Sequence, residues 1–140
     1  ELIEFEPKSN KTDLAQALKF LSGTQKKKAI VFVISDFMTQ EYEQTLKIAS
    51  KKHDITGIRV YDIREEKIPN LGMVPMLDAE TGAIQLVDTG SKSVRMNYEK
   101  HYHDRVAYFK ETFSKSGSGV VSTRVDESYV TKLLGYFKSR

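Results

Sequence analysis

The stretch Ala29–Ile34 is the feature that most limits how this chain can fold, because it is an uninterrupted apolar run rich in β-branched residues. A run of this kind predicts a strand covered on both faces, which is typical of a parallel sheet. The run Ile55–Tyr61 predicts a second strand, and Val120–Thr123 predicts a short third one. The chain is therefore expected to form a small parallel sheet.

Segments with helical spacing of apolar residues lie between these strands. Leu14 and Leu18 belong to the first such segment, with Thr12 as the expected N-cap. Further helices are predicted from Tyr42 to Ala49 and over Ser91–Lys115. Strands that alternate with helices imply right-handed crossovers between parallel strands.

A hairpin and a last helix complete the predicted elements. Met73–Leu77 and Ala83–Val87 flank a short loop with a glycine, as the strands of a β-hairpin do. Asp126 is the expected cap of the last helix, whose inward residues would be Tyr129, Val130, Leu133, Leu134 and Phe137. The predicted fold is a three-layer α/β sandwich with a small, mostly parallel sheet and an inserted β-hairpin, forming a single domain over residues 1–140.

Composition excludes several classes of site. The chain has 140 residues, no cysteine and a net charge of +3. Disulfides, thiolate zinc sites and cysteine nucleophiles are therefore excluded. No apolar run reaches the roughly 20 residues of a membrane span, and Glu1–Phe5 has no basic signal region. We expect a cytoplasmic protein with no membrane span and no nucleic-acid partner.

The carboxyl ends of the predicted strands are the expected place for a ligand. Thr12, Asp13, Ser35, Asp36 and Asp62 should meet there. Asp36 follows a buried strand, so its carboxylate is either a metal ligand or anchor, or a cap or turn residue of the next helix. Thr12 is either a helix cap or an oxygen ligand of Mg²⁺ or Mn²⁺. Asp13 is interpreted as stabilising the positive end of the helix dipole.

The remaining polar residues suggest no nucleophilic enzyme. His101 and His103 are two apart, so on one helix they point to different faces and are interpreted as solvated or capping residues. No Gly-x-Ser-x-Gly elbow and no His-Glu-x-x-His helix occurs in the sequence.

Two motifs resemble a known superfamily. Lys11–Leu18 and Ala29–Phe37, which ends in Ser-Asp-Phe, resemble the second and third motifs of a von Willebrand factor A domain. His53–Ile55, Ile58–Val60 and the closing Asp126–Val130 resemble a bacterial branch, domain-of-unknown-function family 58, often encoded beside MoxR-type AAA+ ATPases. The resemblance implies that Thr12 and Asp36 belong to a metal-ion-dependent adhesion site.

The superfamily's first metal motif, Asp-x-Ser-x-Ser, is absent from this chain. Asp126–Ser128 comes nearest, but Val130 occupies the fifth position. The resemblance therefore implies the C-terminal part of a von Willebrand A-like, Rossmann-like domain. It also implies an open edge on the Ala29–Ile34 strand, where the superfamily's first strand would lie, and we expect self-association through this edge. Thr12 and Asp36 offer too few oxygens to hold Mg²⁺ or Mn²⁺ tightly outside the complete domain.

We expect a protein–protein interaction module rather than an enzyme. The resemblance implies a divalent ion completed by a partner's carboxylate, and a MoxR-type AAA+ ATPase as partner in complex assembly or maturation. The alternative is a small metal-dependent hydrolase or phosphotransfer domain that uses Asp36. That alternative requires a second carboxylate nearby, and Asp62 is the sequence candidate for it.

Overall fold

The computed structural model describes residues 12–78 and 82–139, and its centre is a parallel sheet. Strands β1 (Ile30–Ser35), β2 (Asp54–Tyr61) and β5 (Gly119–Arg124) are arranged in the order β1-β2-β5. Both pairings are parallel, and Val33, Gly57 and Val120 lie side by side across the sheet. The predicted parallel sheet is confirmed.

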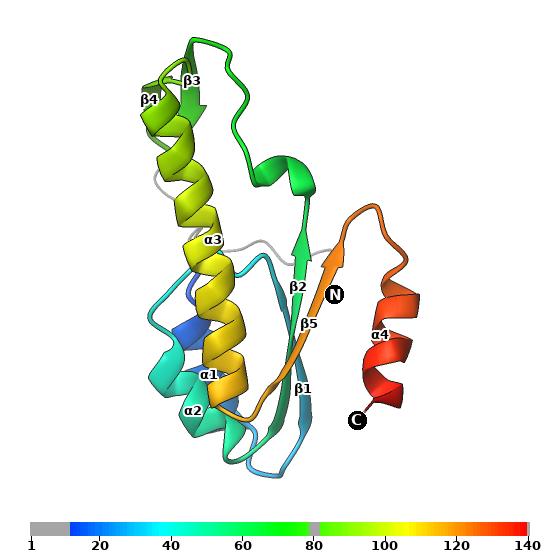
Figure 1. Ribbon diagram of the computed structural model, residues 1–140. Helices are drawn as coiled ribbons and strands as arrows, with labels where there is room; N and C mark the ends of the chain where they lie inside the picture. Colours follow the sequence, from blue (N-terminus) through cyan, green and yellow to red (C-terminus); the bar gives the residue numbers. More distant parts are fainter. Residues whose placement is uncertain (1–11, 79–81, 140) are drawn as a thin grey trace, which may run out of the picture.

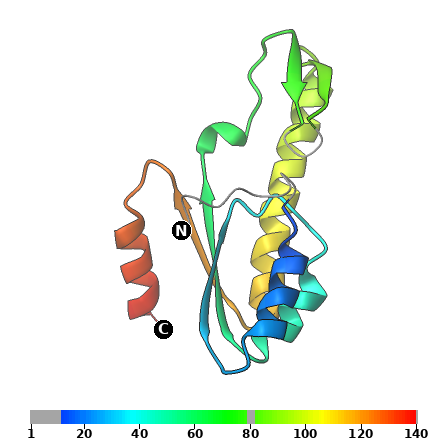
Figure 2. The same ribbon diagram turned by 180° about the vertical axis from the view of Figure 1, so that it is seen from behind.

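Helices lie on both faces of this sheet, so the molecule has three layers. Helices α1 (Leu14–Thr24), α2 (Glu43–Ser50) and α3 (Lys92–Lys115) cover one face, and α4 (Tyr129–Lys138) lies on the other (Figures 1 and 2). The predicted three-layer α/β sandwich is therefore confirmed. No helix among the described residues combines the length and the apolar character that crossing a bilayer requires.

The first helix begins one residue later than predicted. Asp13 is the N-cap of α1, and its carboxylate accepts a hydrogen bond of 2.8 Å from the backbone N–H of Gln16. Thr12 lies outside the helix and is exposed, so the prediction that it caps α1 was wrong. Both residue types cap helices well, and this register buries Leu14 and Leu18 against the core.

The core lies between the sheet and helices α1 to α3. Phe37, Tyr42, Leu46, Phe109 and Phe113 are completely buried in it. The aromatic residues of α3 reach β2 because Gly57 has no side chain. A Cβ atom at this position would lie 2.6 Å from Cε1 of Phe113.

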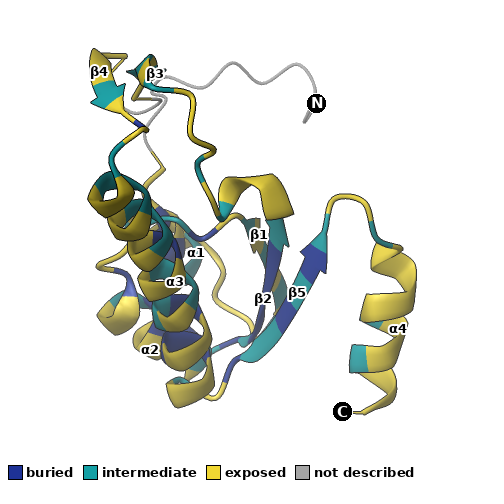
Figure 3. Cartoon of the chain, turned by 45° about the horizontal axis from the view of Figure 1, so that its top comes forward, coloured by how far each residue is buried: buried dark blue, intermediate teal, exposed yellow. Residues whose placement is uncertain are grey.

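Within residues 12–78 and 82–139 the opposite face of β1 is not covered, which contradicts the prediction of a strand buried on both faces. Ile30, Phe32 and Ile34 point away from the core and are 69%, 46% and 68% exposed. The reason is the position of α4, which lies beside β5 and not over β1 (Figure 3). Of the α4 side chains, Phe137 contacts Phe32, with 5.9 Å between the ring centroids.

The apolar residues of α4 were predicted to point inward, and this was wrong for most of them. Tyr136 connects the helix to the sheet, with its hydroxyl 3.3 Å from Oγ1 of Thr56. Leu133 is half-buried. The exposed residues are Tyr129, Val130, Leu134 and Phe137. The helix therefore presents much of its apolar surface to solvent.

The N-cap of α4 is Ser128, not Asp126 as predicted. The Ser128 hydroxyl accepts a hydrogen bond of 3.4 Å from the backbone N–H of Thr131. Asp126 lies two residues before this cap, where its carboxylate binds Arg124. The Asp126 carboxylate, which the sequence pattern assigned to the helix cap, is therefore bound by Arg124 instead.

The predicted hairpin is confirmed. Strands β3 (Met73–Leu77) and β4 (Ile84–Asp88) pair antiparallel at the end of α3 that lies away from the core (Figure 1). A short 3-10 helix, η1 (Ile63–Glu65), follows β2 and leads towards the hairpin. Thr89 is completely buried at the base of the hairpin, where its hydroxyl donates to the carbonyl of Gly72 at 2.7 Å.

Candidate functional site

An apolar groove runs between α1 and the outer edge of β1. Its volume is about 390 Å³. Within the described residues β1 pairs only with β2, so the backbone groups on its other edge have no strand partner. Most of its lining is apolar and comes from the helix and the strand, namely Leu14, Ala17, Leu18, Leu21 and Val31–Ile34. The edge that the resemblance implies to be open thus has no strand partner in the part of the chain that the structure describes, and it borders an apolar groove.

Three of the predicted site residues lie at one end of this groove. Thr12, Asp13 and Ser35 all line it, and Asp36 follows Ser35 directly. Ser35 is the last residue of β1, and Asp13 caps α1. The carboxyl end of the strand and the start of the helix therefore bring these oxygen-bearing side chains to the same place, as predicted.

Asp36 is a turn residue. Its Oδ1 atom accepts hydrogen bonds from the Ser35 hydroxyl and from the backbone N–H of Met38, both at 3.2 Å. Helix α2 has Tyr42 as its N-cap, so Asp36 does not cap it. Both described hydrogen bonds of the carboxylate are made by Oδ1, which leaves the second oxygen for another partner.

Phe37 fixes the loop that carries Asp36. Its backbone has a φ of 57°, which is uncommon and costly for a bulky residue. The side chain is completely buried and stacks on Phe109, with 4.0 Å between the ring centroids. Its backbone N–H also donates to the Ser35 hydroxyl at 3.1 Å. The packing of this ring therefore holds the loop in a strained conformation beside the candidate site.

Arg59 is a second anchor of the same loop, although no motif in the sequence singles it out. It is 3% exposed, and its Nε donates to the carbonyl oxygen of Asp36 at 3.3 Å. Its Nη2 donates to the Tyr102 hydroxyl at 2.6 Å, and its guanidinium lies 4.2 Å from the centre of the Tyr61 ring. The only available signal was a charged residue inside the apolar segment Ile58–Val60.

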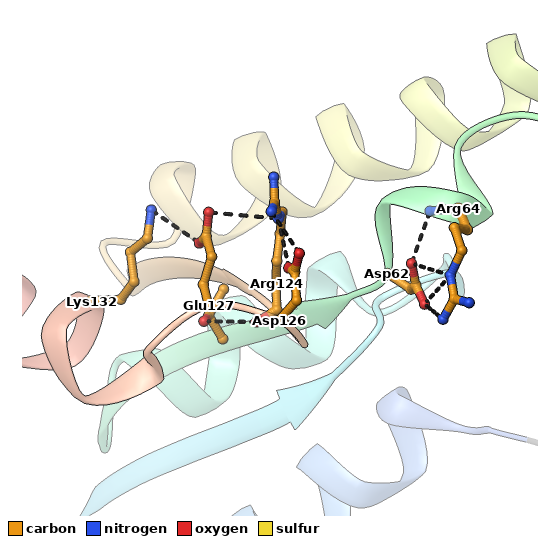
Figure 4. A network of polar contacts seen from close by, with 7 residues as sticks. Asp62, Arg64, Arg124, Asp126, Glu127 and Lys132 are labelled. Atoms are coloured by element: carbon orange, nitrogen blue, oxygen red, sulfur yellow. Dashed lines mark hydrogen bonds and ion pairs between the residues drawn. The ribbon is translucent and has the colours of Figure 1, made fainter.

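The Asp62 carboxylate is bound by Arg64 and does not line the groove. Its carboxylate caps η1 by accepting from the backbone N–H of Arg64 at 2.9 Å, and it also binds the Arg64 guanidinium (Figure 4). The side-chain hydrogen bonds from Arg64, then its backbone N–H, and to a smaller extent the charges of Arg64 and Arg124 together lower the pKa of Asp62 to about 2. The described contacts of the Asp62 carboxylate are with Arg64 and not with Asp36.

A separate ion-pair network links β5 to α4. Arg124 binds Asp126 at 2.7 Å and approaches Glu127 at 3.6 Å, and Lys132 lies 3.4 Å from Glu127 (Figure 4). The hydrogen bond from Arg124 is the main cause of the lowered pKa of Asp126. The segment that comes nearest to the absent metal motif therefore has a structural role in this chain.

The residues at the groove end fit only part of a divalent-ion site. The oxygens of Thr12, Ser35 and Asp36 suit Mg²⁺ or Mn²⁺, which prefer hard ligands. However, the Asp13 carboxylate caps α1, and that of Asp62 binds Arg64. Asp36 is thus the carboxylate left to coordinate an ion that takes about six ligands.

The contacts do not supply the second carboxylate that the hydrolase alternative requires. Asp62 was the sequence candidate for this role, and it is bound to Arg64. The group of His and acidic side chains that converges in the described residues consists of Glu66, Glu99 and His103, and Asp36 is not part of it. No described contact therefore favours the enzymatic alternative.

Comparison with known proteins gives a family and uncharacterised relatives. Residues 1–108 match the family described as "Protein of unknown function DUF58". An uncharacterized protein of Mycobacterium avium is 26% identical over 129 residues, which cover 91% of this chain and 76% of that protein. An uncharacterized protein of Mycobacterium tuberculosis is 24% identical over 135 residues. This chain spans only 42% of the length of that second relative.

Among solved structures, the chain is similar to the conserved hypothetical protein BatB from Bacteroides thetaiotaomicron. The sequences are 14% identical, and the TM-score is 0.38. The similarity covers 91% of this chain and 58% of the BatB chain.

Proposed function

Because this chain belongs to the DUF58 family, whose function is unknown, we propose from its own surface that it is a protein–protein interaction module. The docking surface is the open side of β1, defined by the groove against α1, the unpaired strand edge and the exposed face of Ile30, Phe32 and Ile34. The observation that carries the proposal is this exposed face. Isolated apolar residues on a surface need no explanation, but a contiguous apolar strand face beside an open edge is typical of an interaction site.

The shape of this surface suits the addition of a strand. A partner strand on the open edge would form main-chain hydrogen bonds with β1. Its side chains on one face would enter the apolar groove against α1. Those on the other face would lie beside Ile30 and Ile34, together with whatever element covers that face. A single docking event would thereby bury apolar surface on both sides of the sheet.

In this proposal a divalent metal ion binds to the oxygen-bearing residues at the end of the groove. Thr12 and Asp36 are the proposed ligands of Mg²⁺ or Mn²⁺, with Ser35 at the rim. The missing ligands come from outside these residues, either from a partner's carboxylate or from further residues of a complete domain. The resemblance to the MoxR-associated branch is the support for a MoxR-type AAA+ ATPase as partner in complex assembly or maturation.

The self-association of the isolated chain tests the docking surface. We expect sedimentation velocity to show a concentration-dependent dimer, because an open strand edge pairs readily with a second copy. Ile34→Lys places a charge on the exposed face and should shift the chain towards monomer. Ile48→Lys is the matched control, since Ile48 is 63% exposed on α2, which packs on the other face of the sheet.

Two results would contradict the proposed surface. One is a wild-type chain that stays monomeric at the highest soluble concentration. The other is a dimer that both lysine variants weaken equally, because the change would then be a non-specific effect of charge. Circular dichroism of each variant verifies that the fold is retained.

A further inference from the structure

A cluster of metal-ligating side chains lies outside the site described above. Glu66 is the C-cap that follows η1, and Glu99 and His103 are one turn apart on α3. Residues at this spacing lie on the same face of a helix. The cluster therefore joins the segment that follows β2 to the long helix, and it draws on two elements that are distant in the sequence.

The distances within the cluster are close to those of a metal site. The Nε2 atom of His103 lies 3.5 Å from Oε1 of Glu66 and 3.9 Å from Oε1 of Glu99. One ligand atom from each residue lies within 4.8 Å of the other two. Nitrogen and oxygen ligands about 2.0–2.1 Å from a tetrahedral zinc ion are separated by roughly 3.3–3.5 Å. Small side-chain rotations would bring the three atoms to these positions.

The charges of the cluster also favour a bound cation. Two carboxylates converge here, and the ammonium of Lys67 approaches one of them, Glu99, at 3.4 Å. The described ion-pair partner of Glu66 is the imidazole of His103, which carries a charge only when it is protonated. A divalent cation would neutralise both carboxylates and would leave His103 neutral, as a ligand.

We propose that Glu66, Glu99 and His103 form a binding site for Zn²⁺. One imidazole and two carboxylates provide three ligands, and water completes the tetrahedral shell. A hollow of about 320 Å³, bordered by Ile63, Arg64, Glu66 and Lys67, lies next to the cluster and gives water access. The bound ion ties the end of η1 to α3. The site is independent of the proposed docking surface on β1.

Zinc titration of the untagged 140-residue chain, followed by calorimetry, tests this site. We expect one Zn²⁺ per chain, and we expect Co²⁺ to give the intense visible absorption of a tetrahedral site. His103→Ala and Glu66→Gln should each weaken Zn²⁺ binding by at least roughly tenfold. His101→Ala is the matched control, because His101 is exposed on the same helix and is not part of the cluster. The Zn²⁺ affinity of this variant should equal that of the wild type.

The results of this titration distinguish a zinc site from a cluster of ordinary ion pairs. Equal Zn²⁺ affinity in the wild type and in His103→Ala would overturn the assignment, and so would the absence of Zn²⁺ binding to the wild type. The variants change exposed or half-exposed side chains, and circular dichroism verifies that each remains folded. Asp36→Ala should bind Zn²⁺ as the wild type does, so failure of the proposed Mg²⁺ site would leave this result unchanged.

Discussion

Gly57→Ala tests how the aromatic core packs on the sheet. Gly57 lies in the middle of β2, where a glycine normally weakens a strand. An added methyl group would lie 2.6 Å from Cε1 of Phe113 and 2.7 Å from Cε2 of Phe109. Non-bonded carbon atoms prefer separations of about 3.5–4.0 Å. The methyl group would therefore overlap both rings by roughly 1 Å.

The overlap cannot be relieved cheaply, and this determines the size of the effect. Both rings are completely buried, and Phe37 packs against them at centroid distances of 4.0 Å and 5.3 Å. Overpacking of this kind costs about 1–3 kcal/mol. Replacing glycine by alanine also lowers the conformational entropy of the unfolded chain, which stabilises the folded state by about 0.4–1 kcal/mol. We expect the free energy of unfolding to fall by about 1–2 kcal/mol and Tm to fall by roughly 3–8 °C.

Urea unfolding followed by circular dichroism measures this change, with two glycine controls. Gly23 and Gly135 lie in α1 and α4, and apart from the neighbouring backbone of their own helices no described atom would lie within 4 Å of a Cβ at either position. Alanine at each should raise stability by about 0.5–1 kcal/mol, because glycine destabilises a helix by this amount. Adding Phe113→Leu to Gly57→Ala should cost less than the sum of the single changes, because the residues are in contact. If Gly57→Ala is as stable as the wild type, the described packing of the rings on β2 is wrong.

Two further predictions concern the carboxylates at the edge of the sheet. For Asp36, neither the wild type nor Asp36→Ala should change its own Tm between EDTA, Mg²⁺ and Mn²⁺, because the few ligands here bind an ion weakly, whereas an ion at a hundred times its Kd would add about 2.7 kcal/mol. A metal-dependent rise that the variant loses would show that these few ligands suffice. For Asp62, the pKa is lowered to about 2 in the folded chain, so its interaction with Arg64 stabilises the fold above about pH 4 and is lost as the pH falls towards 2. An NMR titration of the Asp62 carboxyl group should give this low midpoint, whereas a midpoint near 3.8 would show that the Arg64 contact does not persist in solution.

The strands, the hairpin and the long helix could be predicted because each has a local pattern. The run Ala29–Ile34 did form a strand, but its burial on both faces did not follow. An uninterrupted apolar run shows that both faces of a strand are apolar, and it does not show that this chain covers both. The position of α4 beside β5 decides which face stays open, and that depends on contacts of Tyr136 that no local pattern reveals.

The location of the candidate site could be predicted from the sequence more reliably than the contacts of its side chains. Parallel strands bring their carboxyl ends to one edge, and Thr12, Asp13 and Ser35 are found together there. Asp62 was predicted to join these residues, but its carboxylate is bound by Arg64, two residues later in the chain. Arg59 was missed because its partners, Asp36 and Tyr102, come from other elements of the fold.

The geometry of β1 couples the two parts of the proposed function. Ser35 and Asp36 lie at the end of the same strand whose edge and exposed face form the docking surface. A partner strand paired along β1 would end beside these residues, where it could supply the oxygens that the ion lacks. Partner binding would then raise the affinity for Mg²⁺, and by thermodynamic reciprocity Mg²⁺ would raise the affinity for the partner by the same factor. In this arrangement, the weak metal binding that we expect of the isolated chain follows from the same strand edge that we propose as the docking surface.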